Sequence, residues 1–428
     1  MRLSYLPVFA LLWWASAPTI SAADETDPPY AFLQPSRLAS VKQQLRQNTE
    51  RPQTRLAYDQ LLAEADRALD APNPSVTRKT ATPPSGSRHD YLSLGAYWWP
   101  DPHQADGLPW VRRDGQINPA SKDESTDGVR LATFTSRVQA LTLAWYFSGR
   151  QQYADKAIAM IRTWFIDPAT RMNPNLNYAQ GIPGIATGRG AGVLDGRYFS
   201  TRIVDSLIML RKAPGWTTRD EQHMRRWMSE YLHWLQTSQP GRKEAAAKNN
   251  HGSWYAVQTA GIAWYVGETE VVKSMAALLR RKLDHQLMPN GSQPEELART
   301  RSFHYSYFNL QAITDMAVLA ARVGENLWQY QTPQGSSLPQ ALDFMAPYLD
   351  EHKAWPHKTL DRRSSRLIPL MLQADQALKT PRYRARIEQA GFSALLSGAK
   401  EAGRGKGRPV VSVETRRALW LLSSAAGE

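Results

Sequence analysis

The chain has 428 residues, no cysteine and a formal net charge of +13. The absence of cysteine excludes a disulfide framework, a thiol nucleophile and zinc sites built on thiolates. The 52 Lys and Arg residues outnumber the 39 Asp and Glu residues, which predicts attraction of polyanions.

The amino-terminal segment has the pattern of a secretory signal. Arg2 is followed by an apolar run over residues 6–14 and by the small residues Ser21, Ala22 and Ala23. This order predicts a signal peptide over residues 1–23, and the apolar run is too short to cross a bilayer. We therefore expect a periplasmic or secreted protein with no membrane partner after cleavage. Nucleic acid is the usual partner of a basic chain, but export points to an acidic polysaccharide instead.

Helical patterns dominate the rest of the chain and strand signals are scarce. Thr217 and Thr218 ahead of Glu221 give one helix-capping signal. We expect a single domain over residues 24–428, an all-α fold in which helical hairpins form an (α/α) toroid or barrel. A right-handed solenoid is the competing arrangement. Helices are predicted over residues 37–45, 55–69, 129–146, 152–164, 201–211, 218–236, 253–266, 268–287, 305–323, 338–348, 366–377, 381–390 and 413–423.

Residues 76–127 are predicted to form one long loop. Pro, Gly and Asp are dense there and surround aromatic residues, including Tyr97, Trp98 and Trp99. A long loop inside a compact domain is usually a lid or a binding element. We interpret it as a lid over a sugar-binding cleft, with these three aromatic rings stacking on sugar rings. An Ω-loop packed by its own tryptophans is the alternative.

Two short patches carry groups that suit one kind of chemistry. Asn250 and His251 precede the helix predicted from residue 253, and Arg299 precedes Tyr305, which opens another helix. Elimination on a uronic acid requires that the carboxylate is neutralised, the C5 proton removed and the leaving O4 protonated. Amide and imidazolium donors at helix N-termini stabilise the carboxylate charge. A tyrosine whose pKa a guanidinium lowers can act first as base and then as acid.

The chain resembles the alginate-lyase superfamily of secreted bacterial proteins, including polysaccharide lyase families 5 and 38. The resemblance implies an (α/α) barrel in which Asn250 binds the substrate carboxylate and His251 neutralises it or acts as base. It also implies that Arg299 assists a catalytic Tyr305. The motifs that carry it are Tyr91-Leu92-Ser93-Leu94-Gly95-Ala96-Tyr97-Trp98-Trp99-Pro100-Asp101-Pro102, Met172-Asn173-Pro174-Asn175-Leu176, Asn249-Asn250-His251-Gly252 and Glu296-Leu297-Ala298-Arg299-Thr300.

The second patch departs from the family 5 pattern, which has one more residue between the arginine and the tyrosine. Here the stretch reads Arg299-Thr300-Arg301, which is more similar to family 38. Arg301 and Tyr307 therefore remain rivals for the roles of Arg299 and Tyr305, or substrate-binding residues beside them.

A polar loop and a glycine-rich segment complete the set of candidates. Asn175, Asn177 and Gln180 can hydrogen-bond a sugar or its carboxylate, or else cap neighbouring helices. Residues 184–192 are rich in glycine but lack both Gly-Lys-Ser/Thr and a preceding strand, so we expect no nucleotide site. The nine histidines show no His-Glu-x-x-His spacing, so we expect neither a catalytic metal nor an organic cofactor.

These features predict a polysaccharide lyase that cleaves a uronate-containing anionic polysaccharide by β-elimination. Alginate is the leading substrate and glucuronan-type polymers come second. One alternative is a glycoside hydrolase on the same toroid, which needs two facing carboxylates from among Asp195, Glu295 and Glu296. The other is a periplasmic polysaccharide-binding protein without turnover.

Overall fold

The computed structural model describes residues 29–399 and 411–422. The predicted signal peptide over residues 1–23 lies outside these ranges. Within them, no helix is both long enough and apolar enough to cross a membrane.

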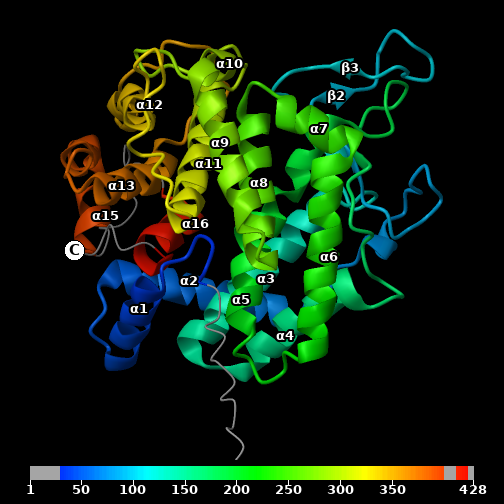
Figure 1. Cartoon of the computed structure of the whole chain (residues 1–428), viewed down its shortest axis with the longest axis horizontal. Helices are drawn as coiled ribbons and strands as arrows, with labels where there is room; N and C mark the ends of the chain where they lie inside the picture. The colour runs from blue at the N-terminus through cyan, green and yellow to red at the C-terminus, as the bar shows by residue number, and fades with distance from the viewer. Residues whose placement is uncertain (1–28, 400–410, 423–428) are drawn as a thin grey trace, which may run out of the picture.

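Helices make up most of the structure, which confirms the all-α prediction (Figure 1). Short 3-10 or π segments extend or join several of them, among them η3 (Arg162–Ile166), η4 (Gly190–Gly196), η5 (Phe199–Val204) and η9 (Ala418–Leu422). The helices are α1 (Pro35–Gln47), α2 (Pro52–Leu69), α3 (Gly128–Ser148), α4 (Gln151–Ile161), α5 (Asp205–Leu210), α6 (Thr218–Thr237), α7 (Gln239–Ala246), α8 (Asn250–Val266), α9 (Thr269–Gln286), α10 (Pro294–Leu297), α11 (Ser302–Arg322), α12 (Leu338–Met345), α13 (Leu367–Leu378), α14 (Arg384–Ile387), α15 (Ser393–Ser397) and α16 (Val413–Arg417).

Consecutive helices pack as hairpins, and the chain returns to its start. The pairs α3–α4 and α8–α9 are in close contact, and α2 packs against both α16 and η9. Arg416 Nε donates to Gln53 Oε1 over 2.9 Å, and Arg417 pairs with Glu64. Because the first and last helices meet, the arrangement is the (α/α) toroid rather than the competing open solenoid.

Burial distinguishes the inner helices from the outer ones. In α8, 14 of the 17 residues are buried, as expected for a helix that is apolar around its whole circumference. The outer helix α6 has a charged face and begins with a capping box formed by Thr217 and Asp220. The sequence had pointed to Glu221 for that box. The structure uses the residue one position earlier, which is the third helical residue.

Two predicted helix starts were wrong in a way that affects the site. Helix α8 begins at Asn250, not at residue 253, because the side chain of Asn249 accepts the backbone N–H of His251 over 3.2 Å. Helix α11 begins at Ser302, so Tyr305 lies in its first turn and does not open it. Asn250, His251 and Tyr305 therefore lie in first helical turns, whereas Arg299 lies in the connection that precedes α11.

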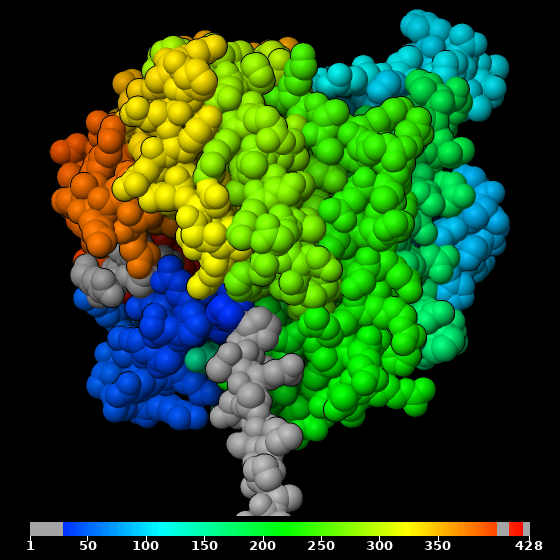
Figure 2. Space-filling model, in the orientation of Figure 1, coloured from blue at the N-terminus to red at the C-terminus, as the bar shows by residue number. Residues whose placement is uncertain are grey.

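The 76–127 segment is more ordered than the prediction of one long loop. Within it, β1 (Leu92–Leu94) pairs in parallel with β4 (Tyr178–Gly181), while β2 (Trp98–Trp99) and β3 (Val111–Arg112) form an antiparallel hairpin. The β2–β3 hairpin projects from the rim of the molecule above α7 (Figures 1 and 2). Only this part has the form expected of a lid.

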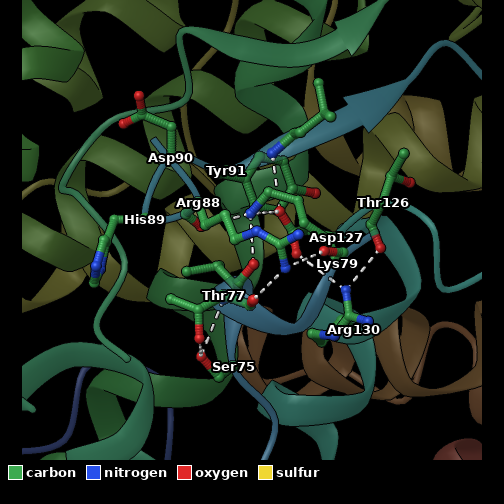
Figure 3. Close-up of polar contacts among 12 residues, drawn as sticks. Ser75, Thr77, Lys79, Arg88, His89, Asp90, Tyr91, Thr126, Asp127 and Arg130 are labelled. Carbon is green, nitrogen blue, oxygen red and sulfur yellow. Dashed lines mark hydrogen bonds and ion pairs between the residues drawn. The ribbon is translucent and has the colours of Figure 1, made fainter. Parts of the chain in front are cut away.

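A buried ion pair ties the two ends of the 76–127 segment together (Figure 3). Lys79 Nζ lies 2.9 Å from Asp127 Oδ2, and neither side chain is exposed. Lys79 also donates to the carbonyl of Arg88 over 2.8 Å, and Asp127 accepts the backbone N–H of Leu92 and the guanidinium of Arg130. Burial lowers the pKa of Lys79 and raises that of Asp127, so each charge depends on the other.

Candidate active site

His251 is held by a buried carboxylate. Its Nδ1 lies 2.7 Å from Glu244 Oε1 on α7, and the Glu244 side chain is almost fully buried. Gly252, the next residue, permits this arrangement, because a Cβ there would collide with the carbonyl of Ala247. With Nδ1 facing Glu244, the other ring nitrogen, Nε2, is the one left for a ligand.

Asn250 is completely buried and connects the two patches. Its backbone N–H donates to Glu296 Oε1 over 2.6 Å, and its Nδ2 donates to Glu296 Oε2 over 2.8 Å. Burial raises the pKa of Glu296 to about 7, against the opposing effects of the Asn250 hydrogen bonds and of the Arg299 and His251 charges. One of the two amide N–H groups of Asn250 is thus used within the protein.

Tyr305 is nearly buried and lies between a guanidinium and a second phenol. The Arg299 guanidinium is 3.8 Å from the centre of its ring, and its hydroxyl is 2.7 Å from the hydroxyl of Tyr97. Burial raises the pKa of Tyr305 well above its ordinary value, Tyr97 raises it further, and Arg299 lowers it. The expected effect of the arginine therefore has the predicted sign, but burial outweighs it and the tyrosine keeps its proton.

The base of the β2–β3 hairpin rests on the second patch. Arg299 Nη2 lies 2.7 Å from Asp114 Oδ1, and the backbone N–H of Thr300 donates to Asp114 Oδ2 over 3.1 Å. These contacts hold the pKa of Asp114 well below its usual range, although burial opposes them. Gly115 has φ +78° and a Cβ there would collide with the Thr300 hydroxyl, so glycine is required at this crossing.

Arg301 and Tyr307, the two rivals, lie in different surroundings. Arg301 Nη2 pairs with Asp361 Oδ2 at 2.5 Å, and its Nη1 donates to the Tyr97 hydroxyl over 3.3 Å. Tyr307 is half-buried, with the Arg366 guanidinium 5.8 Å from its ring centre. Burial raises the pKa of Tyr307 as well. Arg301 thus reaches the catalytic candidates through Tyr97, whereas Tyr307 lines a small neighbouring pocket with His304 and Arg366.

Comparison with known proteins places the chain in a family. The family model described as alginate lyase matches residues 75–355. The chain belongs to the alginate lyase family. A crystal structure of an alginate lyase from Bacteroides ovatus is 35% identical, with a TM-score of 0.80, and the match covers 85% of this chain and 95% of that one. The protein is therefore a polysaccharide lyase with the (α/α) toroid fold of its relatives.

A more distant relative shares the fold alone. Alginate lyase A1-III from Sphingomonas species A1, solved as a histidine-to-alanine variant with a bound tetrasaccharide, is 17% identical with a TM-score of 0.51. The match covers 80% of this chain and 91% of that one. No curated protein matches the chain significantly.

Trp98 and Trp99, which were predicted to stack on sugars, make contacts within the protein in the hairpin region of this lyase. Trp99 Nε1 donates to the carbonyl of Gln116 over 2.9 Å, and the Arg113 guanidinium lies 5.3 Å from a Trp99 ring. The carbonyl of Trp98 accepts from Asn118 Nδ2 over 2.8 Å. Both indoles are only partly buried, and the contacts of the Trp99 indole and the Trp98 backbone brace the hairpin region.

The polar loop residues make internal contacts. Asn175 Oδ1 accepts the backbone N–H of Asn177, and Asn177 Oδ1 accepts from Trp234 Nε1 over 2.9 Å. Gln180 donates to Asp195 and accepts from Arg189, each over 2.8 Å. Among the contacts in residues 29–399 and 411–422, none joins these three side chains to His251 or Tyr305.

The three carboxylates considered for hydrolysis do not form a facing pair, because two are bonded within the protein and one is exposed. Asp195 accepts from Tyr91, Ser93 and Gln180, Glu296 binds Asn250, and Glu295 is exposed on the short helix α10. In the same two described ranges, no three His, Asp or Glu side chains lie together as a metal site would need.

The sequence analysis did not predict Glu244 or Asp114 as site residues. It also did not predict that the Tyr97 hydroxyl contacts the Tyr305 hydroxyl. Glu244 lies in a short helix that the sequence did not predict, seven residues before His251. Asp114 lies among the turn residues of the presumed lid. The one available signal was Glu296, which belongs to the same motif as Arg299 and was considered only as a hydrolytic carboxylate.

Proposed function

We propose that the protein cleaves alginate by β-elimination at a site formed by Asn250, His251, Arg299 and Tyr305. The observation that carries this proposal is that Glu296 connects both patches, because it binds Asn250 and interacts electrostatically with Arg299 and His251. Trp254 of α8 and Phe308 of α11 also pack with their ring centres 4.9 Å apart. The 35% identity to an alginate lyase supports alginate over glucuronan-type polymers.

In this proposal the carboxylate beside the reacting carbon lies at the start of α8. Backbone N–H groups and the helix dipole favour an anion there. His251 donates a hydrogen bond or a full positive charge through Nε2, and Glu244 stabilises the imidazolium. Asn250, which is completely buried, fixes this end of α8 through its two bonds to Glu296. The backbone and imidazole donors stabilise the charge that develops on the carboxylate once the C5 proton leaves.

We assign both proton transfers to Tyr305. In the resting protein its pKa is raised, mainly by burial and further by the proximity and hydrogen bond of Tyr97. A sugar that separates the two hydroxyls would remove the Tyr97 contribution, and the lowering effect of Arg299, which favours the phenolate, would then be opposed by burial alone. The phenolate takes the C5 proton and returns it to O4. His251 as base is the alternative, because Nδ1–H donation to Glu244 would leave Nε2 with a free lone pair.

The test is the release of unsaturated uronate, followed by ultraviolet absorbance, from a panel of purified uronate polymers. Tyr305→Phe should lower turnover on alginate by about 10²- to 10⁴-fold while oligosaccharide binding is retained. Tyr330→Phe, which removes a hydroxyl bonded to Asp284 on α9, serves as the matched control. Undiminished activity in Tyr305→Phe would refute the assignment. Reducing ends that accumulate without absorbance would indicate hydrolysis.

A further inference from the structure

A cavity of about 480 Å³ opens between α2, α3 and η5, and no residue of the proposed catalytic set lines it. We call it the α2–α3 cavity. Its wall includes Arg67 on α2, Arg137 on α3, and Arg202 with Tyr198 at the start of η5. Small-molecule sites typically enclose roughly 300–1,000 Å³, so the cavity is large enough for a ligand. The family match begins at residue 75, so Arg67 lies outside the matched segment.

The charge of this wall is positive. Its acidic residue, Glu64, already pairs with Arg417 and lies 3.4 Å from the Ser136 hydroxyl. Arg202 is held by the carbonyl of Ala132 and the hydroxyl of Thr135, each 3.3 Å from Nη1. Across the parts of the chain that the structure describes, Arg67 and Arg137 have no ion-pair partner. Two guanidinium groups thus remain to bind an anion.

A continuous line of aromatic rings and guanidinium groups joins the cavity to the candidate catalytic tyrosine. The ring centres of Tyr305 and His304 are 5.2 Å apart, and His304 stacks on Phe308 at 5.7 Å. The Arg197 guanidinium then lies 5.5 Å from the centre of the Phe308 ring and 4.0 Å from the centre of the Tyr198 ring, and the Arg202 guanidinium also lies 4.0 Å from the centre of the Tyr198 ring. His304, Phe308, Arg197, Tyr198 and Arg202 are all only partly buried.

We propose that the α2–α3 cavity is a distal subsite that binds uronate residues remote from the bond that is cut. Their carboxylates pair with Arg67 and Arg137, and a sugar face packs on Tyr198. Guanidinium groups bind carboxylates in two parallel hydrogen bonds, and an aromatic ring offers an apolar face to a sugar. The inference rests on the proposed function, because it requires an anionic sugar chain whose reacting residue lies beside Tyr305.

The proposal predicts dependence on chain length. A short oligouronate that fills only the region around Tyr305 cannot reach the cavity, whereas a longer one gains the contacts with Arg67 and Arg137. Longer substrates should therefore have a lower KM, with a smaller effect on kcat, because these contacts form in both the ground state and the transition state.

The experiment compares Arg67→Gln/Arg137→Gln with Arg219→Gln/Arg226→Gln. The control pair lies on the exposed face of α6 and removes the same net charge, so it reports any loss of long-range attraction. Arg202 is left unchanged because it also bonds α3. With oligouronates of defined length, the cavity variant should show a KM about five- to tenfold higher for the longest substrates and less than about twofold higher for the shortest. Equal changes at all lengths, or the same changes in the control, would overturn the inference.

Binding separates this inference from the proposed function. Calorimetry with an eight-residue oligomannuronate, on the Tyr305→Phe background, should show about fivefold weaker binding when Arg67 and Arg137 are replaced. Equal affinities would overturn the distal subsite even if the enzyme is an active lyase. If the unmodified protein released no unsaturated uronate, the elimination proposal would fail, while a loss of affinity would still support the cavity as an anionic-sugar site.

Discussion

The hydroxyl groups of Tyr97 and Tyr305 lie 2.7 Å apart although 208 residues separate them in the chain. Tyr97 comes from the 76–127 segment and Tyr305 from the first turn of α11. The same Tyr97 hydroxyl accepts a hydrogen bond from Arg301 over 3.3 Å. The proposed lid therefore reaches the candidate proton-transfer group directly and changes its acidity.

Tyr97→Phe should shift the pH dependence of the enzyme. Tyr97 raises the pKa of Tyr305, so its removal lowers that pKa. If Tyr305 is the base, the acidic limb of the kcat/KM profile moves to lower pH, because the phenolate forms more easily. If Tyr305 acts only as acid, the alkaline limb moves to lower pH instead. A profile with neither limb displaced would contradict any catalytic role for this hydroxyl.

Replacement of Glu244 tests how His251 acts. Glu244→Gln keeps an oxygen for Nδ1–H but removes the negative charge, whereas Glu244→Ala removes both. We expect kcat to fall by about tenfold in the glutamine variant and further in the alanine variant, with KM changing less. Steady-state kinetics alongside thermal melting separate this effect from unfolding. Equal, full activity in both variants would mean that the carboxylate does not assist the imidazole.

The Lys79–Asp127 pair offers a stability prediction. Lys79→Met leaves buried Asp127 with Arg130 as its remaining counter-charge, and losing the fully buried partner should cost about 3–5 kcal/mol in the free energy of unfolding. Lys79→Met/Asp127→Asn should recover part of this loss, because the asparagine oxygen can still accept the Leu92 N–H. Urea unfolding measures both. A single variant that loses less than about 1 kcal/mol would show that the pair is not needed to hold the segment.

Glu296 should make stability depend on pH. Its pKa is raised to about 7 by burial, above an ordinary value near 4.3. The native state therefore binds the proton more tightly than the unfolded state, and stability falls as pH rises from about 4.5 to 7. The stability of the unmodified protein relative to Glu296→Gln, measured as the difference in unfolding free energy, should be greater at pH 5 than at pH 7.5, by up to roughly 3 kcal/mol. An equal difference at both pH values would place the pKa near its ordinary value.

The local sequence pattern predicted most helices well, because apolar periodicity and helix caps depend on residues that are close together in the chain. It failed where long-range packing decides. Helix α7 is only eight residues long, so its periodic signal is weak, and Glu244 was missed with it. The pKa of Tyr305 depends on burial by segments far away in the chain, which no spacing between Arg299 and Tyr305 reveals. Likewise, the partner of Arg299 proved to be Asp114, 185 residues earlier.

Arg299 contacts Asp114 at the base of the β2–β3 hairpin and also lies over the ring of Tyr305. If the hairpin lifts, both Asp114 and the Tyr97 hydroxyl leave, and the full guanidinium charge acts on the phenol. Lid opening and phenol ionisation are then thermodynamically linked, and each favours the other by the same free energy. An enzyme built in this way would ionise its tyrosine mainly when a polymer strand has entered.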